Sequence, residues 1–307
     1  MNISSISKSY NKLDNIGKSL VFIILFLLTI SICKLIFKNN NFLDNYTEGF
    51  ENNDYDNQNM YDKFYTSIYD FIAFDDDKNN FEINKIIELT NPDMNSVILD
   101  IGSGMGHHVN SLDKSYCGEI IGIDKSQHMV EHSKKIYPDI SASFQIIDIT
   151  KGKSFPNQHF SHILCLYFTI YYIQDHKMFL QNCFNMLKND AYMVIHLVNV
   201  DGISTLLRPD YVNSVSNDYV PKTTIDFNKF QYTAKFDNSI DDKKVIFKEK
   251  FVFKNGKKRT HKHSLYMIDQ EIILNYARNV GFIIHGKVNM GDCNYDNHFL
   301  YILKKPY

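Results

Sequence analysis

The feature that most constrains the fold is a glycine-rich loop that directly follows a short apolar segment. Residues 97–99 read Val-Ile-Leu, and the chain continues as Asp100-Ile101-Gly102-Ser103-Gly104-Met105-Gly106. Glycines let the backbone turn sharply and let a ligand approach the main chain without a Cβ in the way. An apolar strand, a glycine loop and a helix form a nucleoside- or phosphate-binding turn at the carboxyl edge of a parallel sheet. The loop therefore predicts an α/β fold.

The spacing and charge of this loop separate two classes of ligand. Dinucleotide sites favour the spacing G-x-G-x-x-G, whereas here the glycines run G-x-G-x-G and Asp100 stands two residues before Gly102. A carboxylate repels a pyrophosphate and attracts a cation. The loop therefore suits a positively charged amino-acid ligand, and an NAD(P)-dependent oxidoreductase is the less favoured alternative.

The remainder of the chain alternates strand-like and helix-like segments, which is typical of βαβ units. Hydrophobic patterning predicts seven strands, over residues 96–100, 119–124, 143–148, 162–167, 192–198, 282–288 and 299–303. It predicts helices over residues 60–70, 81–89, 107–112, 126–136, 176–187 and 269–279. We expect a seven-stranded, mostly parallel sheet with helices on both faces.

Three stretches resemble the class I S-adenosylmethionine-dependent methyltransferases. Residues 100–106 have the form acidic-x-G-x-G-x-G. In residues 121–129 a strand ends in Asp124, and the pattern x-Ser-x-x-Met opens the next helix. Residues 186–192 form a helix-turn-strand pattern. The resemblance covers residues 60–307 and implies a Rossmann-like methyltransferase domain with S-adenosylmethionine as cofactor. It departs at Ser161, where the family usually has an acid.

The resemblance also implies roles for individual residues. Asp124 would bind both ribose hydroxyls, Met129 would lie against the adenine and Asp148 would lie near the adenine amino group. Tyr65 belongs to an aromatic stripe that would either pack or close over the sulfonium, whose positive charge an aromatic face stabilises. The expected cofactor-binding residues are Asp100, Gly102, Ser103, Gly104, Gly106, Asp124, Lys125, Met129, Asp148, Ile149, Leu166 and Tyr65.

The methyl acceptor is not identified by the sequence. His196 and Tyr171, near the ends of two expected strands, are the candidate general bases, although transfer to an already nucleophilic atom needs little beyond positioning. We expect a small-molecule acceptor, and a catalytically inactive binding protein is the alternative. No metal site is expected, because His107-His108 lacks partners at ligand spacing and the five cysteines are scattered.

Residues 227–266 predict an antiparallel insertion, since Asn255-Gly256 is a strong hairpin turn, and the resemblance implies that it forms a lid over the substrate. Its basic residues are Lys248, Lys250, Lys254, Lys257, Lys258, Arg259 and Lys262. They form either a solvated face or a contact for an anionic substrate, nucleic acid or lipid headgroups. The formal net charge of −2 gives no general indication of nucleic acid.

The N-terminal part of the chain predicts a membrane anchor. After a tail of residues 1–18, residues 19–38 are long and apolar enough for a transmembrane helix, with a buried helix or a cleaved signal peptide as alternatives. Residues 39–59 are polar and predict a flexible linker. We therefore expect a single-pass membrane protein whose catalytic domain, residues 60–307, faces the cytosol, with its oligomeric state open.

Overall fold

The computed structural model describes residues 53–115, 118–152, 154–203, 206, 222–241 and 244–307, together with scattered positions between Asp14 and Thr29. The chain divides into two compact units, residues 1–49 and 50–307. The second unit carries both sheets.

The prediction of a single-pass membrane location is corrected by the structure. Crossing a bilayer takes about 20 consecutive apolar residues in one helix. Among the residues that the structure describes, no helix combines that length with that apolar character. Most of the predicted span, residues 19–38, lies outside the described residues.

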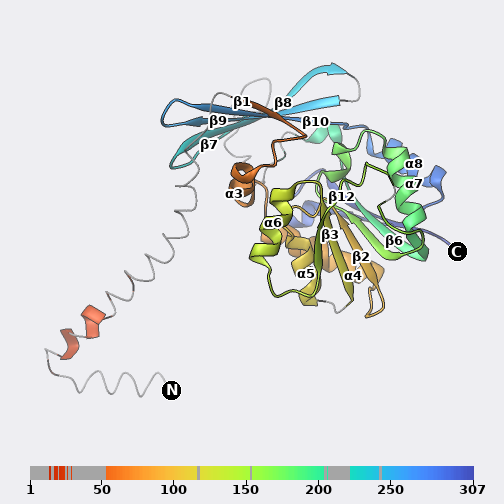
Figure 1. The fold of residues 1–307 in the computed structure, drawn as a ribbon, viewed down its shortest axis with the longest axis horizontal. Helices are drawn as coiled ribbons and strands as arrows, with labels where there is room; N and C mark the ends of the chain where they lie inside the picture. Colours follow the sequence, from red (N-terminus) through yellow and green to blue (C-terminus); the bar gives the residue numbers. More distant parts are fainter. Residues whose placement is uncertain are drawn as a thin grey trace. The chain divides into compact units, whose positions relative to one another are not determined.

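The larger sheet has seven strands and confirms the expected α/β class (Figure 1). The middle of the sheet is parallel, whereas the last two strands of the chain run antiparallel to their neighbours. In spatial order the strands are β11 (Ile283–Asn289), β12 (His298–Lys304), β6 (Leu187–Val198), β5 (Phe160–Cys165), β2 (Val97–Ile101), β3 (Glu119–Asp124) and β4 (Ser143–Ile146).

The helices begin mostly at polar caps, and most of them pack on this sheet. Asp62, Asp75, Ser126, Asp175 and Asp269 each accept a hydrogen bond from a backbone amide of the first turn, which is the usual way to start a helix. The helices are α3 (Lys63–Ile72), α4 (Asp76–Thr90), α5 (His107–Ser115), α6 (Gln127–Ile136), α7 (His176–Met186) and α8 (Gln270–Val280), with short 3₁₀ turns η2 (Thr169–Tyr172), η3 (Val200–Gly202) and η5 (Met290–Cys293). Apolar residues of α4, α5 and α6 share one core, and α7 contacts α8.

The order of the parallel strands creates a crevice at their carboxyl ends. The chain runs from β2 to β3 and β4 on one side, then crosses to β5 and β6 on the other side. Ligands of open α/β sheets bind at such a reversal. The loops after β2 and β5 meet there, because a Cβ on Gly102 would lie 2.6 Å from Cγ2 of Thr169.

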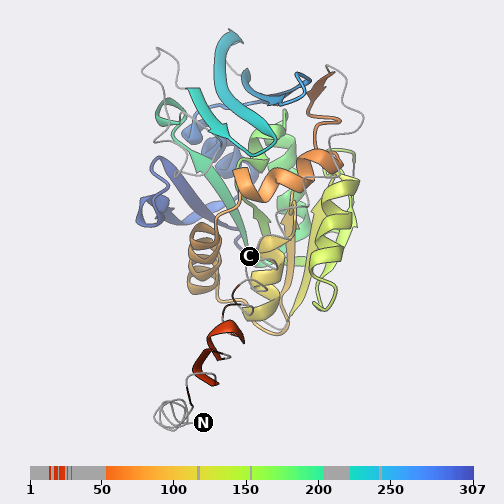
Figure 2. The same cartoon turned by 90° about the vertical axis from the view of Figure 1, so that its left-hand side faces the viewer.

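A second, five-stranded sheet contains the predicted antiparallel insertion. Its order is β1 (Asn53–Asp56), β10 (Lys258–Leu265), β9 (Lys244–Phe253), β8 (Phe230–Asp241) and β7 (Lys222–Asp226). All neighbours are antiparallel except β1 and β10. Residues 53–56, which the sequence placed in a linker, instead form an edge strand. Figure 2 shows α3 along one face of this sheet, where Phe64 packs edge-on against Phe251.

The buried position of Arg259 corrects the predicted basic surface. Its side chain is fully buried, its guanidinium lies 3.7 Å from the ring centroid of Tyr55, and Nη1 donates to Asp62 Oδ2 at 2.9 Å. Arg259 therefore joins β10 to β1 and to the start of α3. Lys262 pairs with Asp54 at 2.6 Å, so part of the remaining charge is also neutralised.

Candidate functional site

A cavity opens where the carboxyl edge of the larger sheet meets α3 and the second sheet. Its wall toward the larger sheet contains the expected residues Gly102, Gly104, Asp124, Lys125, Met129, Asp148 and Ile149. The opposite wall contains Tyr61, Tyr65, Tyr69, Tyr172, Phe247, Glu249 and His263. A smaller cavity adjoins it and is lined by Asp100, Gly102, Ser103, Gly104, His107, His108 and Leu166, among others. The structure thus brings eleven of the twelve expected cofactor residues to these two cavities.

Asp124 ends β3 and fastens the glycine loop. Its Oδ2 accepts a hydrogen bond from the Gly104 amide at 3.1 Å, and its Oδ1 accepts one from the Ser126 amide at 2.8 Å. Burial raises the pKa of this carboxyl above its usual value, while the backbone amides oppose the shift. Each oxygen retains accepting capacity, so the carboxylate can take both hydroxyls of a cis-diol.

Gly104 and Gly106 have different roles, although both adopt positive φ. At Gly104 (φ +54°) an added Cβ would meet no atom within 4 Å, so the loop presents bare main chain to open space. At Gly106 (φ +82°) an added Cβ would lie 2.6 Å from the Phe144 ring. Gly106 therefore permits close packing of α5 against β4 and, unlike the other expected residues, does not line either cavity.

Asp100 presents an unpartnered carboxylate oxygen. Its side chain is buried, and among the described residues its Oδ2 has no hydrogen-bond partner. Burial raises the pKa of this carboxyl to about 6. A buried acceptor without a donor is unfavourable, and an ammonium group in the smaller cavity would satisfy it. Asp100, Asp124 and Gly104 together fit a cationic nucleoside.

His196 and Tyr171, the expected general bases, line neither cavity. His196 is fully buried, its Nε2 lies 2.9 Å from His298 Nδ1, and its Nδ1 accepts from the Phe168 amide at 3.3 Å. Burial lowers the pKa of His196 well below its usual value. The hydroxyl of Tyr171 accepts from the Val198 amide at 2.9 Å. Through these hydrogen bonds both side chains join the segment that follows β5, which contains Phe168 and Tyr171, to strand β6 in the protein interior.

That segment carries two unusual backbone conformations. Tyr167 (φ +36°) and Phe168 (φ +43°) adopt the left-handed backbone conformation, which non-glycine residues rarely adopt. Such conformations persist only where the surroundings enforce them, and they concentrate at functional sites. Here the Tyr167 hydroxyl donates to the Leu206 carbonyl at 2.5 Å, and His196 holds the Phe168 amide. The segment thereby places Phe168 on the cavity wall.

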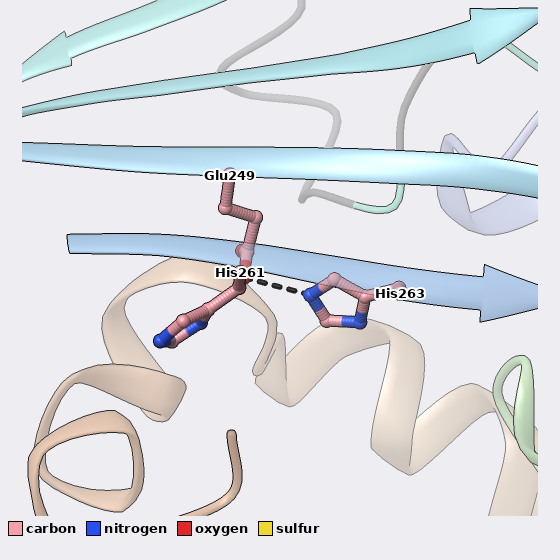
Figure 3. A group of neighbouring side chains, drawn as sticks. All are labelled: Glu249, His261 and His263. Carbon is pink, nitrogen blue, oxygen red and sulfur yellow. Dashed lines mark hydrogen bonds and ion pairs between the residues drawn. The ribbon is translucent and has the colours of Figure 1, made fainter. Parts of the chain in front are cut away.

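Sequence reasoning missed a buried cluster of Glu249, His261 and His263 (Figure 3). These side chains come from the adjacent strands β9 and β10, and their polar atoms lie within 4.8 Å of one another. The signal was present in the hairpin turn Asn255-Gly256, because its register sets Glu249 opposite His261. His263 follows two residues later and so shares the face of His261.

Two imidazoles and a carboxylate are a set that can bind a transition metal, but here hydrogen bonds already satisfy the carboxylate. Oε1 of Glu249 accepts from the hydroxyls of Tyr65 and Tyr232 at 2.9 and 2.6 Å. Oε2 lies 3.1 Å from His261 Nδ1 and 2.7 Å from His263 Nε2. These four partners occupy the roughly four lone-pair sites of a carboxylate.

Arg259 fixes the proton position on His261. Its Nε donates to His261 Nε2 at 2.6 Å, so that nitrogen carries no proton and Nδ1 must carry it. A metal on Nδ1 would require the proton on Nε2, opposite another donor. The cluster is therefore a hydrogen-bonded network.

Comparison with known proteins identifies a methyltransferase domain in the chain. Residues 98–190 match the family model described as "Methyltransferase domain", and no curated protein sequence matches the chain. Many solved structures share the fold, and three illustrate the likeness. A S-adenosylmethionine-dependent methyltransferase from Clostridium acetobutylicum is 18% identical, with a TM-score of 0.59 over 79% of this chain and 96% of that one. The CcbJ methyltransferase from Streptomyces caelestis is 11% identical, with a TM-score of 0.62 over 82% and 100%.

The third is S-adenosylmethionine-bound CalS10 from Micromonospora echinaspora, an amino pentose methyltransferase involved in calicheamicin biosynthesis. It is 12% identical, with a TM-score of 0.55 over 75% of this chain and 90% of that one. At these identities the structural likeness shows the fold, whereas the family model matches the glycine loop and the strands that follow it. Together they show that the chain carries a methyltransferase domain with the fold of the S-adenosylmethionine-dependent methyltransferases.

Proposed function

We propose that this chain methylates a small molecule in the cavity between the larger sheet and the second sheet. The observation that carries the proposal is the pair of carboxylates flanking Gly104, namely Asp124 on the larger cavity and the unpartnered Asp100 on the smaller one. We place the catalytic domain at residues 60–307, with β1 as an added edge strand.

Each side of the cavity has a separate task in this proposal. Bound S-adenosylmethionine supplies an electrophilic methyl group on a sulfonium. Asp124 accepts the ribose hydroxyls, and Asp100 pairs with the ammonium group. Lys125 lies beside Asp124, and Met129, Asp148 and Ile149 border the adenine. Gly102 and Ser103 shape the loop, and Leu166 supports the smaller cavity from the apolar core.

The position of the second sheet favours an acceptor of small size. Glu249, His263 and Phe247 form a wall of the cavity from β9 and β10, so this sheet limits the space left beside the cofactor. CalS10, which has the same fold, acts on an amino pentose. We therefore propose that the acceptor belongs to the amino sugars or to small alcohols and amines of similar size.

Transfer of radiolabelled methyl from S-adenosylmethionine to a panel of amino sugars, amines and alcohols tests the proposal. Labelled product from at least one acceptor, lost in Asp124→Ala, is expected. Tight cofactor binding with no turnover across the panel would instead favour a catalytically inactive binding protein.

A further inference from the structure

We propose that Tyr61, Tyr172 and His263 form a relay that removes a proton from the methyl acceptor, with the Glu249 carboxylate as the fixed negative charge behind it. The inference rests on the proposed function, because it concerns the same cavity. It adds that the acceptor atom carries a proton before transfer, as a hydroxyl or an amine does.

The relay is a continuous set of short hydrogen bonds. The Tyr61 hydroxyl donates to the Tyr172 hydroxyl oxygen at 2.9 Å. The Tyr172 hydroxyl lies 2.6 Å from His263 Nδ1, and His263 Nε2 lies 2.7 Å from Glu249 Oε2 (Figure 3). All four residues line the cavity, so the relay begins where an acceptor would bind.

Glu249 fixes the direction of every bond in this set. Burial disfavours its charge, but His263 and His261 together hold the pKa of the carboxyl below its usual range. A carboxylate can only accept, so His263 must donate from Nε2. In the neutral imidazole, which the relay requires, Nδ1 is then bare and accepts from Tyr172, which in turn accepts from Tyr61. Each donor points away from the acceptor site and toward Glu249.

The surroundings of His263 contain no second charge in direct contact among the described residues. Tyr61, Tyr65 and Tyr172 approach its ring, and Phe247 packs edge-on from β9. His261 lies beside it on β10, and the Arg259 cation reaches that neighbour, not His263 itself. Glu249 is thus the charge that an imidazolium at His263 would meet.

The two phenols transmit a proton without storing charge. Burial raises the pKa of Tyr61 and of Tyr172 well above the usual value, so neither persists as a phenolate. His263 is then the group that retains the proton. The main chain of Tyr61 is also tied to the start of α6, because Ser126 Oγ donates to the Tyr61 carbonyl at 2.7 Å.

The chemical step balances without a further reactant. The bond between the acceptor atom and the methyl carbon forms, and the carbon–sulfur bond breaks with its electron pair going to sulfur. The acceptor proton moves to the Tyr61 oxygen, the Tyr61 proton to Tyr172, and the Tyr172 proton to His263 Nδ1. Neutral His263 becomes an imidazolium beside the Glu249 carboxylate.

Nitrogen-15 NMR of the full chain, labelled at histidine and saturated with S-adenosylhomocysteine, tests the relay without an acceptor. His263→Gln assigns the signals. We expect His263 to be protonated at Nε2 and bare at Nδ1, and Tyr172→Phe to shift the Nδ1 signal alone. The control is Tyr301→Phe on β12, which removes a hydroxyl that donates to Gln270 Oε1 at 2.8 Å. This substitution should shift neither nitrogen signal of His263. A proton on Nδ1, or a stoichiometric metal ion lost in His263→Gln, would overturn the proposal.

Turnover of any acceptor from the panel gives a second readout. Tyr61→Phe and Tyr172→Phe should each lower kcat by about 100-fold or more, the usual contribution of general-base catalysis, and keep S-adenosylmethionine affinity within about threefold. Their kcat should recover with rising pH as the acceptor ionises unaided. Unchanged kcat in both variants would refute the relay. Failure of the wild-type chain to bind S-adenosylmethionine would instead refute the proposed function, and the same NMR measurement on the ligand-free chain would still test the relay.

Discussion

The Gly104 amide donates a hydrogen bond to Asp124 Oδ2 at 3.1 Å, which fastens the loop after β2 to the end of β3. The same carboxylate accepts from the Ser126 amide at the start of α6. Asp124 therefore both shapes the glycine loop and offers oxygens to a ligand. A substitution there should affect binding through both routes.

Asp124→Ala should weaken S-adenosylmethionine binding by about 100-fold or more, equivalent to about 2.7 kcal/mol, because the ribose acceptors are lost and two backbone amides lose their partner. Asp124→Asn keeps one accepting oxygen, so its affinity for S-adenosylmethionine should lie between those of the wild type and of Asp124→Ala. Isothermal titration calorimetry measures the dissociation constants. Equal affinities in all three chains would contradict the role of Asp124.

Gly104→Ala should abolish cofactor binding, and Gly152→Ala should leave it intact. Both glycines have positive φ, +54° and +83°, and neither has an atom within 4 Å of an added Cβ. Both substitutions should lower the free energy of unfolding by a similar amount, about 1–2 kcal/mol. Only Gly104 lines the cavity. Equal loss of binding in the two variants would show that backbone strain, not the position of the Cβ, decides the effect.

The affinity for S-adenosylmethionine should rise with pH up to about 6 and then level off. Burial raises the pKa of Asp100 to about 6, so below that pH the free protein holds the protonated form, which cannot pair with an ammonium group. Affinity should fall by up to tenfold for each pH unit below the pKa. Titration calorimetry from pH 5 to 8 measures this. Asp100→Asn should flatten the profile, and a wild-type profile that is already flat would rule out this pairing.

Lys78→Met should destabilise the fold far more than Lys85→Met, although both lysines lie on α4. Lys78 Nζ lies 2.8 Å from Glu82 Oε2, with both side chains buried, whereas Lys85 and Glu88 form an exposed pair at 2.7 Å. Breaking a buried pair leaves an uncompensated charge and costs about 3–5 kcal/mol, and losing an exposed pair costs about 1 kcal/mol or less. Urea denaturation compares the variants. Similar losses of unfolding free energy in the two variants would contradict this expectation. They would mean that His108, 2.7 Å from Glu82, stabilises the Glu82 carboxylate without Lys78.

Local sequence signals predicted the larger sheet well because its strands are continuous apolar runs. The strand over residues 119–124 was predicted with its observed bounds, and it correctly placed Asp124 at the carboxyl edge. The edge strand β1 was missed because Asn53-Asp54-Tyr55-Asp56 has no apolar alternation. Its pairing with β10 joins residues about 200 positions apart, which no local pattern reveals.

Two residues have surroundings that the sequence did not indicate, because contacts distant in sequence determine them. Arg259 was assigned to an exposed basic surface because the sequence does not show that Tyr55 and Asp62 cover it. His196 was proposed as a base because it lies near a strand end. However, β6 is flanked by β5 and β12, and its His196 side chain points into the interior. Position along a strand predicted the edge of the sheet but not which face remains open.

Calorimetric titration of the full chain with S-adenosylmethionine, and in parallel with NAD, tests the central claim most directly. The account predicts one S-adenosylmethionine bound per chain and no heat from NAD, because Asp100 and Asp124 favour a cation and disfavour a pyrophosphate. Binding of NAD, or no binding of S-adenosylmethionine, would contradict it.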